Sequence, residues 1–372
     1  MFTHRLVFPA SVLRGRGAIN HLGAMCGRLG QRALLVGGKR GIASVEARVA
    51  DQLDQQMVSY LGHEVLDGPC CEEAINKLAE SLKRHGVEVL IATGGGRALD
   101  TAKAAGVRCN IPVVTLPSIA STCSAVTPLT FRYHPNGQFR DMFPLAYGPA
   151  AVVVDADLLA TAPLSGLSAG LGDTLAKWYE YRAISDINQL SGLSGVARTN
   201  SELCFTLIQH FAADACLAVR QGQANMALEQ VLDAIFLYAG LTSIMSSGAH
   251  TGAAHALYGG FTACEKTRQV AHGLLVGYGN LCLLALENRP DNELLAALEL
   301  ARACDIPVAL AQLSPSLNEA DIQLIVAQSL KVADMANMPF EITQRQLRSA
   351  IERVEKLSAD DRFVILTDDT SQ

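Results

Sequence analysis

The feature that most constrains this chain is a change of hydrophobic period near residue 160. Before that point, helical stretches alternate with short runs of Val, Ile and Leu. Four such runs cover residues 32–38, 87–96, 111–122 and 150–159. Continuous runs of Val, Ile and Leu with helices between them are typical of a parallel sheet that is covered on both faces. The first part therefore predicts an α/β domain, whose ligands would bind beyond the carboxyl ends of the strands.

The rest of the chain almost lacks strand patterns. Six segments between residues 203 and 359 repeat their apolar residues at the 3.6-residue period of an amphipathic helix. Pro163 and Gly166 break the pattern within residues 160–166, as turn residues do. We therefore predict two domains, an α/β domain over residues 1–162 and a helical domain over residues 163–372.

Composition excludes several classes of protein. A chain of 372 residues that is 49% hydrophobic and 18% charged can build a sizeable core. Its net charge of −6 argues against nucleic-acid binding. There is no run of about 18 apolar residues to predict a membrane span, and the start lacks the apolar region of a signal peptide. The ten cysteines follow no zinc-type spacing, so we expect a reduced, cytoplasmic protein in which they serve as small hydrophobic residues.

A glycine triplet at residues 94–96 follows the apolar run at 87–96. In LIATGGGRALDTAK a predicted strand passes through these glycines into a helix. Bare backbone N–H groups and a helix N-terminus can bind a pyrophosphate there. The triplet lacks the G-x-G-x-x-G spacing, so a plain tight turn is an equal alternative. The next apolar run ends in PSIASTCS, where Ser118, Ser121 and Thr122 favour one ligand shared by both loops.

One acid and two histidines form a candidate metal site. Asp173 lies just inside the glycine-rich start of SAGLGDTLAKWYE, His255 lies in a small-residue helical segment, and His272 begins another helix. Each histidine alone is more typical of a structural residue. Together, one carboxylate and two imidazoles can bind Zn²⁺ or Fe²⁺ and leave positions for a substrate oxygen.

Four motifs in order carry a family resemblance: GGGRALDTAK, PSIASTCSAVTPLTFRY, GLGDTLAKWYE and GAAHALYGG…AHG. Over nearly its whole length the chain resembles the iron-containing, or group III, alcohol dehydrogenases. Within them it is similar to the glycerol dehydrogenase branch, and most of all to hydroxycarboxylate dehydrogenases of that branch. The resemblance implies an N-terminal dinucleotide-binding domain, a C-terminal helical metal-binding domain and an active site in the cleft between them. It also implies a homo-oligomer, a dimer or larger.

The resemblance also implies roles for individual residues. Asp173, His255 and His272 match the metal ligands of glycerol dehydrogenases. Lys177 stands where other branches add a histidine, which implies zinc rather than iron. The matches to the cofactor loops are Gly94, Gly95, Gly96, Arg97 and Ala98 around the pyrophosphate, Ser118, Ile119, Ala120 and Ser121 in the second loop, and Thr127, Leu129 and Tyr133 beside the nicotinamide.

The chain departs from glycerol dehydrogenases after its first apolar run. Those enzymes carry an Asp there that holds the ribose hydroxyls of NAD, whereas this chain has Gly38, Lys39 and Arg40. Lys and Arg can pair with a 2′-phosphate. We therefore predict a preference for NADP(H) over NAD(H). The alternative is that both cations are solvated loop residues.

A second departure concerns the substrate. Glycerol dehydrogenases have an acid close to the polyol where this chain has Cys123. A thiol removes both the negative charge and the strong acceptor, so an anionic substrate loses a repulsion. A reactive thiol is the other interpretation, but no general base for it is evident nearby.

The main hypothesis is therefore metal-assisted hydride transfer between NADP(H) and a small 2-oxo or 2-hydroxy carboxylic acid, such as 2-oxobutanoate or 2-oxoglutarate. The first alternative is an NAD-dependent glycerol or polyol dehydrogenase. A lyase similar to dehydroquinate synthase would need more basic residues around its phosphorylated substrate. A non-catalytic scaffold would not need all three metal-site residues.

Overall fold

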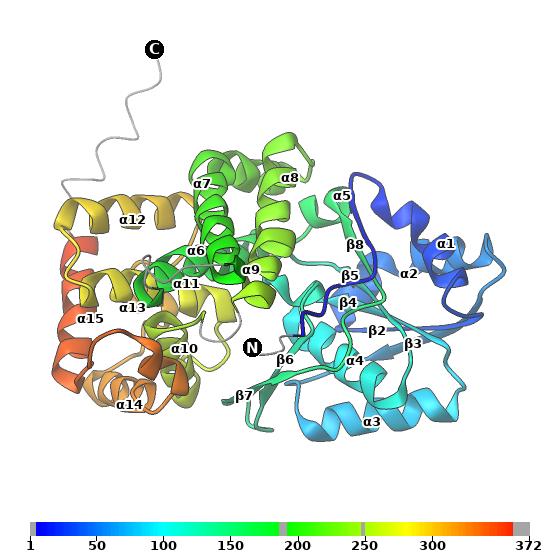
Figure 1. Ribbon diagram of the computed structural model, residues 1–372, viewed down its shortest axis with the longest axis horizontal. Coiled ribbons are helices and arrows are strands. Elements are labelled where there is room, and N and C mark those ends of the chain that lie inside the picture. The colour runs from blue at the N-terminus through cyan, green and yellow to red at the C-terminus, as the bar shows by residue number, and fades with distance from the viewer. Residues whose placement is uncertain (1–4, 186–191, 247–249, 360–372) are drawn as a thin grey trace, which may run out of the picture.

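The computed structural model describes residues 5–185, 192–246 and 250–359. It has two parts, a sheet with its covering helices and a larger assembly of helices (Figure 1). All strands of the described residues end by Asp155, which confirms the predicted fold class. The domain boundary expected at residue 162 falls between α5 (Ala156–Ala160) and α6 (Leu164–Ile184) and stays a prediction.

The sheet has six strands in the order β1-β8-β5-β4-β2-β3. All of its pairings are parallel. The strands are β1 (Val12–Gly15), β2 (Arg32–Gly37), β3 (Ser59–Val65), β4 (Val89–Gly94), β5 (Val113–Pro117) and β8 (Ala151–Asp155). Sequence patterns predicted the four inner strands and missed β1 and β3. These two are edge strands with partly exposed side chains, so they show no continuous apolar run.

Helices bury both faces of the sheet, which explains the apolar runs of the inner strands. Neighbouring strand residues point to opposite faces. Leu35 packs on the face covered by α1 (Leu22–Gly27) and α2 (Lys39–Asp54). Leu34 and Val36 belong to the core on the other face, covered by α3 (Glu72–Arg84) and α4 (Gly96–Cys109).

A hairpin of β6 (Leu129–Tyr133) and β7 (Phe139–Pro144) leaves the sheet and meets the helical part. The turn between the two strands contains Pro135, Asn136 and Gly137, residue types that favour a tight reversal. The Phe139 N–H donates to the Thr262 hydroxyl (3.2 Å). The Tyr258 hydroxyl donates to that of Tyr133 (3.0 Å). The hairpin therefore connects the two parts next to the cavity described below.

The helical part is built around α6 and α11 (His272–Leu286), which contact each other extensively. A Cβ on Gly172 would lie 2.2 Å from the carbonyl oxygen of Gly273, and one on Gly273 would lie 1.8 Å from that of Ala169. Only glycine allows the two backbones to approach this closely. The other helical segments are α7 (Gly192–Gln221), α8 (Met226–Leu232), the π-helix η4 (Asp233–Tyr238), α9 (Ala239–Met245), α10 (Ala253–Ala263), α12 (Asp291–Ala303), α13 (Leu310–Leu313), α14 (Glu319–Ser329) and α15 (Gln344–Ser358), with short 3-10 turns η1 (Ala18–His21), η2 (Cys123–Ala125) and η5 (Ala333–Asn337).

In the part of the chain that the structure describes, two helical stretches are long and apolar enough to cross a membrane by length and composition alone. They are Gly192–Gln221 and Met226–Met245, and their apolar windows are 39% and 56% buried in the fold. Core helices of soluble proteins meet the same criterion, so these stretches are weak evidence for a membrane span.

Candidate active site

A cavity of about 930 Å³ lies between the sheet and the helical part. The segments that follow β2, β4 and β5 form one side of it, and α6, α10 and α11 form the other. Its volume is near the upper end of the range for ligand cavities, about 300–1,000 Å³. The cavity is thus a cleft at the carboxyl ends of the strands, where the sequence predicted a ligand.

The glycine triplet forms one wall of this cleft. Gly94 has a φ of +124°, a conformation that favours glycine. Gly95 precedes the first turn of α4, and a Cβ on it would lie 2.6 Å from Cδ1 of Ile119. The two predicted cofactor loops therefore touch, and the α4 N-terminus faces the space that they enclose with the positive end of its dipole.

A buried ion pair in α4 holds the second loop in place. The Lys103 ammonium lies 2.9 Å from the Asp100 carboxylate. It also donates to the carbonyl oxygens of Ser124, Thr127 and Leu129, at 2.6–2.9 Å. Sequence reasoning missed this pair, although an acid and a base three residues apart in an apolar helix are an unusual pattern.

Nearly all of the predicted cofactor residues line the cleft. They are Gly38, Lys39, Arg40, Gly94, Gly95, Gly96, Arg97, Ala98, Ser118, Ile119, Ser121, Thr127, Leu129 and Tyr133. Ala120 is the exception, because it is buried and its carbonyl faces α6, 1.9 Å from where a Cβ on Gly170 would stand. Their cofactor roles stay predictions.

The end of the cleft near α2 carries charges of both signs. Lys39 and Arg40 form the exposed first turn of α2, after Gly38. Glu64 and Asp67, at the end of β3 and just beyond it, line the same region. Neither acid was noticed in the sequence, because β3 itself was missed.

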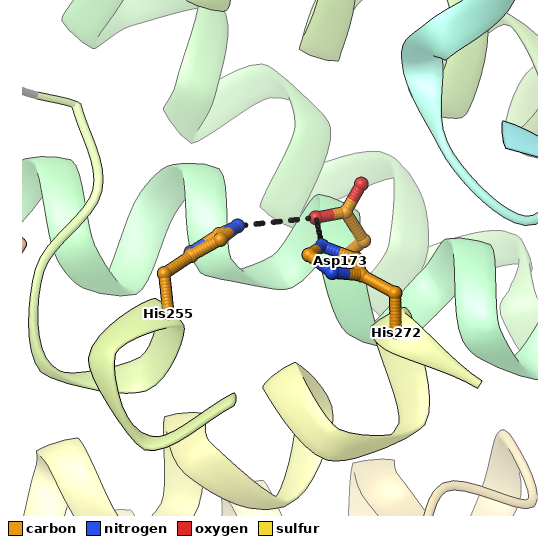
Figure 2. A group of neighbouring side chains, drawn as sticks. All are labelled: Asp173, His255 and His272. Atoms are coloured by element: carbon orange, nitrogen blue, oxygen red, sulfur yellow. Dashed lines mark hydrogen bonds and ion pairs between the residues drawn. The ribbon is translucent and has the colours of Figure 1, made fainter. Parts of the chain in front are cut away.

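Asp173, His255 and His272 converge at the other end of the cleft, from α6, α10 and α11 (Figure 2). Nε2 of His272 lies 3.3 Å from Oδ1 of Asp173, and Nε2 of His255 lies 3.5 Å from the same oxygen. One ligand atom from each residue lies within 4.8 Å of the others. Two tetrahedral zinc ligands, each about 2.0–2.1 Å from the ion, are about 3.3–3.4 Å apart. The three side chains therefore fit a divalent metal.

Glu180 orients His255. Its Oε2 lies 2.6 Å from Nδ1 of His255, and its Oε1 accepts the backbone N–H groups of Gly252 (2.8 Å) and His255 (2.9 Å). A carboxylate on Nδ1 keeps the proton there and leaves the Nε2 lone pair free for a metal. Sequence reasoning missed Glu180, although Asp173, Lys177 and Glu180 are four and seven residues apart and so share one helix face.

Electrostatics keep this cluster charged. Burial opposes ionisation of Asp173, but Lys177 and the two histidines hold its pKa well below its usual range. Burial also disfavours a charged His255, yet Glu180 and Asp173 outweigh it and raise the pKa of His255 to about 9. Burial lowers the pKa of His272, against the pull of Asp173. A metal must therefore displace a proton from His255.

Cys123 and Lys177 line the cleft beside this cluster. Burial raises the pKa of the Cys123 thiol, so the thiol is neutral at physiological pH. Lys177 is 4% exposed. Burial disfavours its charge, but Asp173 more than compensates and raises the pKa of Lys177. The cleft thus presents a neutral thiol and an ammonium next to the metal ligands.

Comparison with known proteins decides the family. The family model for "Iron-containing alcohol dehydrogenase" matches residues 9–156. The glycerol dehydrogenase of Citrobacter freundii is 31% identical over 350 residues, which cover 92% of this chain and 94% of that protein. The chain belongs to the iron-containing alcohol dehydrogenase family. This confirms the resemblance in the four motifs, and it makes the chain an oxidoreductase that acts on alcohol groups with a nicotinamide cofactor and a divalent metal.

Other members of the iron-containing alcohol dehydrogenase family match at similar levels. Hydroxycarboxylate dehydrogenase A of Escherichia coli (strain K12) is 31% identical over 360 residues, 95% of this chain and 98% of that protein. A crystal structure of a probable glycerol dehydrogenase from Sinorhizobium meliloti 1021 superposes with a TM-score of 0.84 at 28% identity, over 96% of this chain and 99% of that one. The dehydrogenase assignment leaves the lyase and scaffold alternatives without support.

Proposed function

We propose that this iron-containing alcohol dehydrogenase transfers a hydride between NADP(H) and a small 2-oxo or 2-hydroxy carboxylic acid. The observation that carries the proposal is the neutral thiol of Cys123, buried next to the metal ligands in place of the acid of glycerol dehydrogenases. An acid there would repel a substrate carboxylate and accept hydrogen bonds from a polyol. A neutral thiol does neither.

The other carboxylates of the cleft do not replace that missing acid. Glu64 and Asp67 lie at the far end, near α2. Asp100 is occupied by Lys103, by the Ser124 hydroxyl (2.6 Å) and by the Phe131 N–H (2.9 Å). Asp173 faces the two histidines. Among the described residues that line this side of the cleft, an anionic substrate therefore meets no free acid.

Asp173, His255 and His272 would hold the metal, which we propose to be zinc because Lys177 stands where a fourth ligand would come from. The bound metal would polarise the carbonyl oxygen of the substrate. The chain's own contribution is to orient the imidazole of His255 through Glu180. It also packs the Phe131 ring against that of His272, with 5.8 Å between the ring centroids.

The preference for NADP(H) is supported by Lys39 and Arg40, which line the cleft on the first turn of α2. Side chains at this position can reach the 2′-phosphate of NADP(H) when the ribose binds near the N-terminus of the helix. A cytoplasmic location and a homo-oligomeric state, dimer or larger, stay predictions.

A second candidate is an NAD-dependent glycerol or polyol dehydrogenase. Relatives named glycerol dehydrogenase favour it, including those of Citrobacter freundii and Pseudomonas putida, at 31% and 30% identity. The competing observation is the Cys123 thiol, which lacks the acceptor strength that a polyol needs.

The deciding experiment follows NADPH and NADH oxidation separately with the purified, zinc-loaded protein. The substrates are 2-oxobutanoate, 2-oxoglutarate, pyruvate and, for the polyol reaction, dihydroxyacetone. We expect NADPH oxidation with a 2-oxo acid. Oxidation of NADH alone, and only with dihydroxyacetone, would contradict the proposal and support the second candidate.

A further inference from the structure

Two lysines are almost fully buried in this fold, and they differ in their direct hydrogen bonds and ion pairs. Lys103 and Lys177 are 2% and 4% exposed. Lys103 makes an ion pair and three hydrogen bonds. Within residues 5–185, 192–246 and 250–359, no hydrogen bond or ion pair joins Nζ of Lys177 to another group. Lys177 lines the cleft, so its ammonium is open to a ligand bound there, and a largely desolvated cation favours an anionic ligand.

The position of Lys177 shows where that anion would lie. Lys177 lines the cleft and follows Asp173 by four residues in α6. Four residues advance a helix by about 6 Å and return to the same face. Lys177 is therefore the next side chain beyond the metal ligand on the cleft side of α6, beside Cys123.

The charges of the metal-loaded cluster lead to the same conclusion. A divalent cation is matched by the carboxylates of Asp173 and Glu180, with both histidines neutral. The thiols of Cys123 and Cys204, the other groups around Lys177, have pKa values that burial raises, so they carry no charge. Within this cluster the charge of Lys177 would then remain, and a monoanionic substrate would neutralise it.

We propose that the ammonium of Lys177 binds the carboxylate of the substrate and thereby selects 2-oxo acids over neutral carbonyl compounds. The proposal rests on the proposed function. In a 2-oxo acid the carboxylate is bonded directly to the reacting carbonyl carbon, so its site must adjoin the metal ligands. Lys177 meets that requirement, because it lies about one helical turn beyond Asp173 on the cleft side of α6.

The competing explanation is that Lys177 only balances the charge of Asp173. In that case its substitution would weaken metal binding and would not change the choice between an acid and its amide. The two explanations therefore differ in a readout that does not depend on catalysis.

The test uses the zinc-loaded protein with NADP⁺ and oxamate, an inert analogue of a 2-oxo acid, whose dissociation constant is measured by calorimetry. Lys177→Met keeps a flexible, unbranched side chain that is one atom shorter and removes its charge, and Lys177→Arg keeps the charge. Lys331→Met is the matched control, because Lys331 is exposed and lies in the same helical part. Zinc content and NADP⁺ affinity are measured for each variant.

We expect Lys177→Met to bind oxamate about 100-fold more weakly, with zinc content and NADP⁺ affinity unchanged. Lys177→Arg should recover part of the loss, and Lys331→Met should match the unsubstituted protein. In Lys177→Met, the ratio of kcat/KM for 2-oxobutanoate to kcat/KM for its amide should fall together with the affinity for oxamate. Unchanged oxamate binding, or loss of zinc from both Lys177 variants, would overturn the proposal.

The outcomes separate this proposal from the proposed function. If the unsubstituted enzyme reduces no 2-oxo acid but binds oxamate through Lys177, the proposed function is wrong and the carboxylate site stands. If it reduces 2-oxo acids and Lys177→Met keeps the acid-to-amide ratio, the proposed function stands and the role of Lys177 is wrong.

Discussion

The substitution Glu180→Gln is the sharpest test of how this fold prepares a metal site. The carboxylate of Glu180 is fully buried and accepts two backbone N–H groups on one oxygen and Nδ1–H of His255 on the other. Glutamine has one oxygen only. If that oxygen keeps the backbone N–H groups, the amide NH₂ faces Nδ1 and donates to it. The imidazole proton then moves to Nε2, the nitrogen that faces Asp173.

A protonated Nε2 cannot bind a metal, so Glu180→Gln should weaken zinc binding. Loss of a carboxylate behind a metal-binding histidine costs about 10- to 100-fold in metal affinity, or about 1.4–2.7 kcal/mol. Turning the amide round does not help, because its NH₂ would then face the N–H groups of Gly252 and His255.

The assay is competition for zinc against a chelator of known affinity. Glu355→Gln is the matched control, because Glu355 also accepts two hydrogen bonds, from the Tyr278 hydroxyl (2.8 Å) and the Leu310 N–H (2.9 Å), away from the metal ligands. We expect the control to keep its zinc affinity. A Glu180→Gln protein that binds zinc within twofold of the unsubstituted protein would refute the tautomer argument.

Three further predictions follow from the same structure. Because the pKa of His255 is about 9 without metal, apparent zinc affinity should rise about tenfold per pH unit from pH 7 to about 9 and then level off. A flat profile in a buffered chelator titration would contradict this. Gly172→Ala would place a Cβ 2.2 Å from the Gly273 carbonyl oxygen, so it should cost about 1–3 kcal/mol or more in unfolding free energy and release zinc. A Cβ on Gly195 in α7 would meet open space, so Gly195→Ala should raise the free energy of unfolding by about 0.5–1 kcal/mol. The stability of both variants is measured by chemical denaturation. Arg40→Ala should raise the KM for NADPH about tenfold and leave that for NADH unchanged in steady-state kinetics. An equal change for both cofactors would argue against a 2′-phosphate contact.

The pH dependence of the metal-free fold has the opposite sign. A histidine whose pKa is raised from 6.5 to about 9 on folding binds its proton more tightly in the folded state. Its contribution to stability is complete below about pH 6.5 and is lost as the pH rises through about 9. The midpoint of thermal unfolding of the metal-free protein should therefore fall over this interval. A midpoint that rises there would show that Glu180 and Asp173 do not hold the charged His255.

The accuracy of the sequence prediction depended on how local each feature is. The inner strands β2, β4, β5 and β8 carry apolar runs because both of their faces are buried, so they were predictable. The edge strands β1 and β3 are half exposed and were missed. Among functional residues, Asp173 and the two histidines could be proposed because carboxylates and imidazoles are metal ligands by their own chemistry.

Other features required the tertiary structure. Asp173 and His272 are 99 residues apart in the chain, and only the close glycine contact of α6 with α11 brings them together. Lys103 and Lys177 both lie in apolar helices a few residues after an acid, so the local pattern does not predict their different surroundings. The fold surrounds Lys103 with carbonyl oxygens and leaves Lys177 facing the cleft. Local patterns set the elements and the available chemistry, because periodicity and ligand type belong to short segments. Burial, hydrogen-bond partners and charge balance arise from contacts between distant segments, so the packed fold alone determines them.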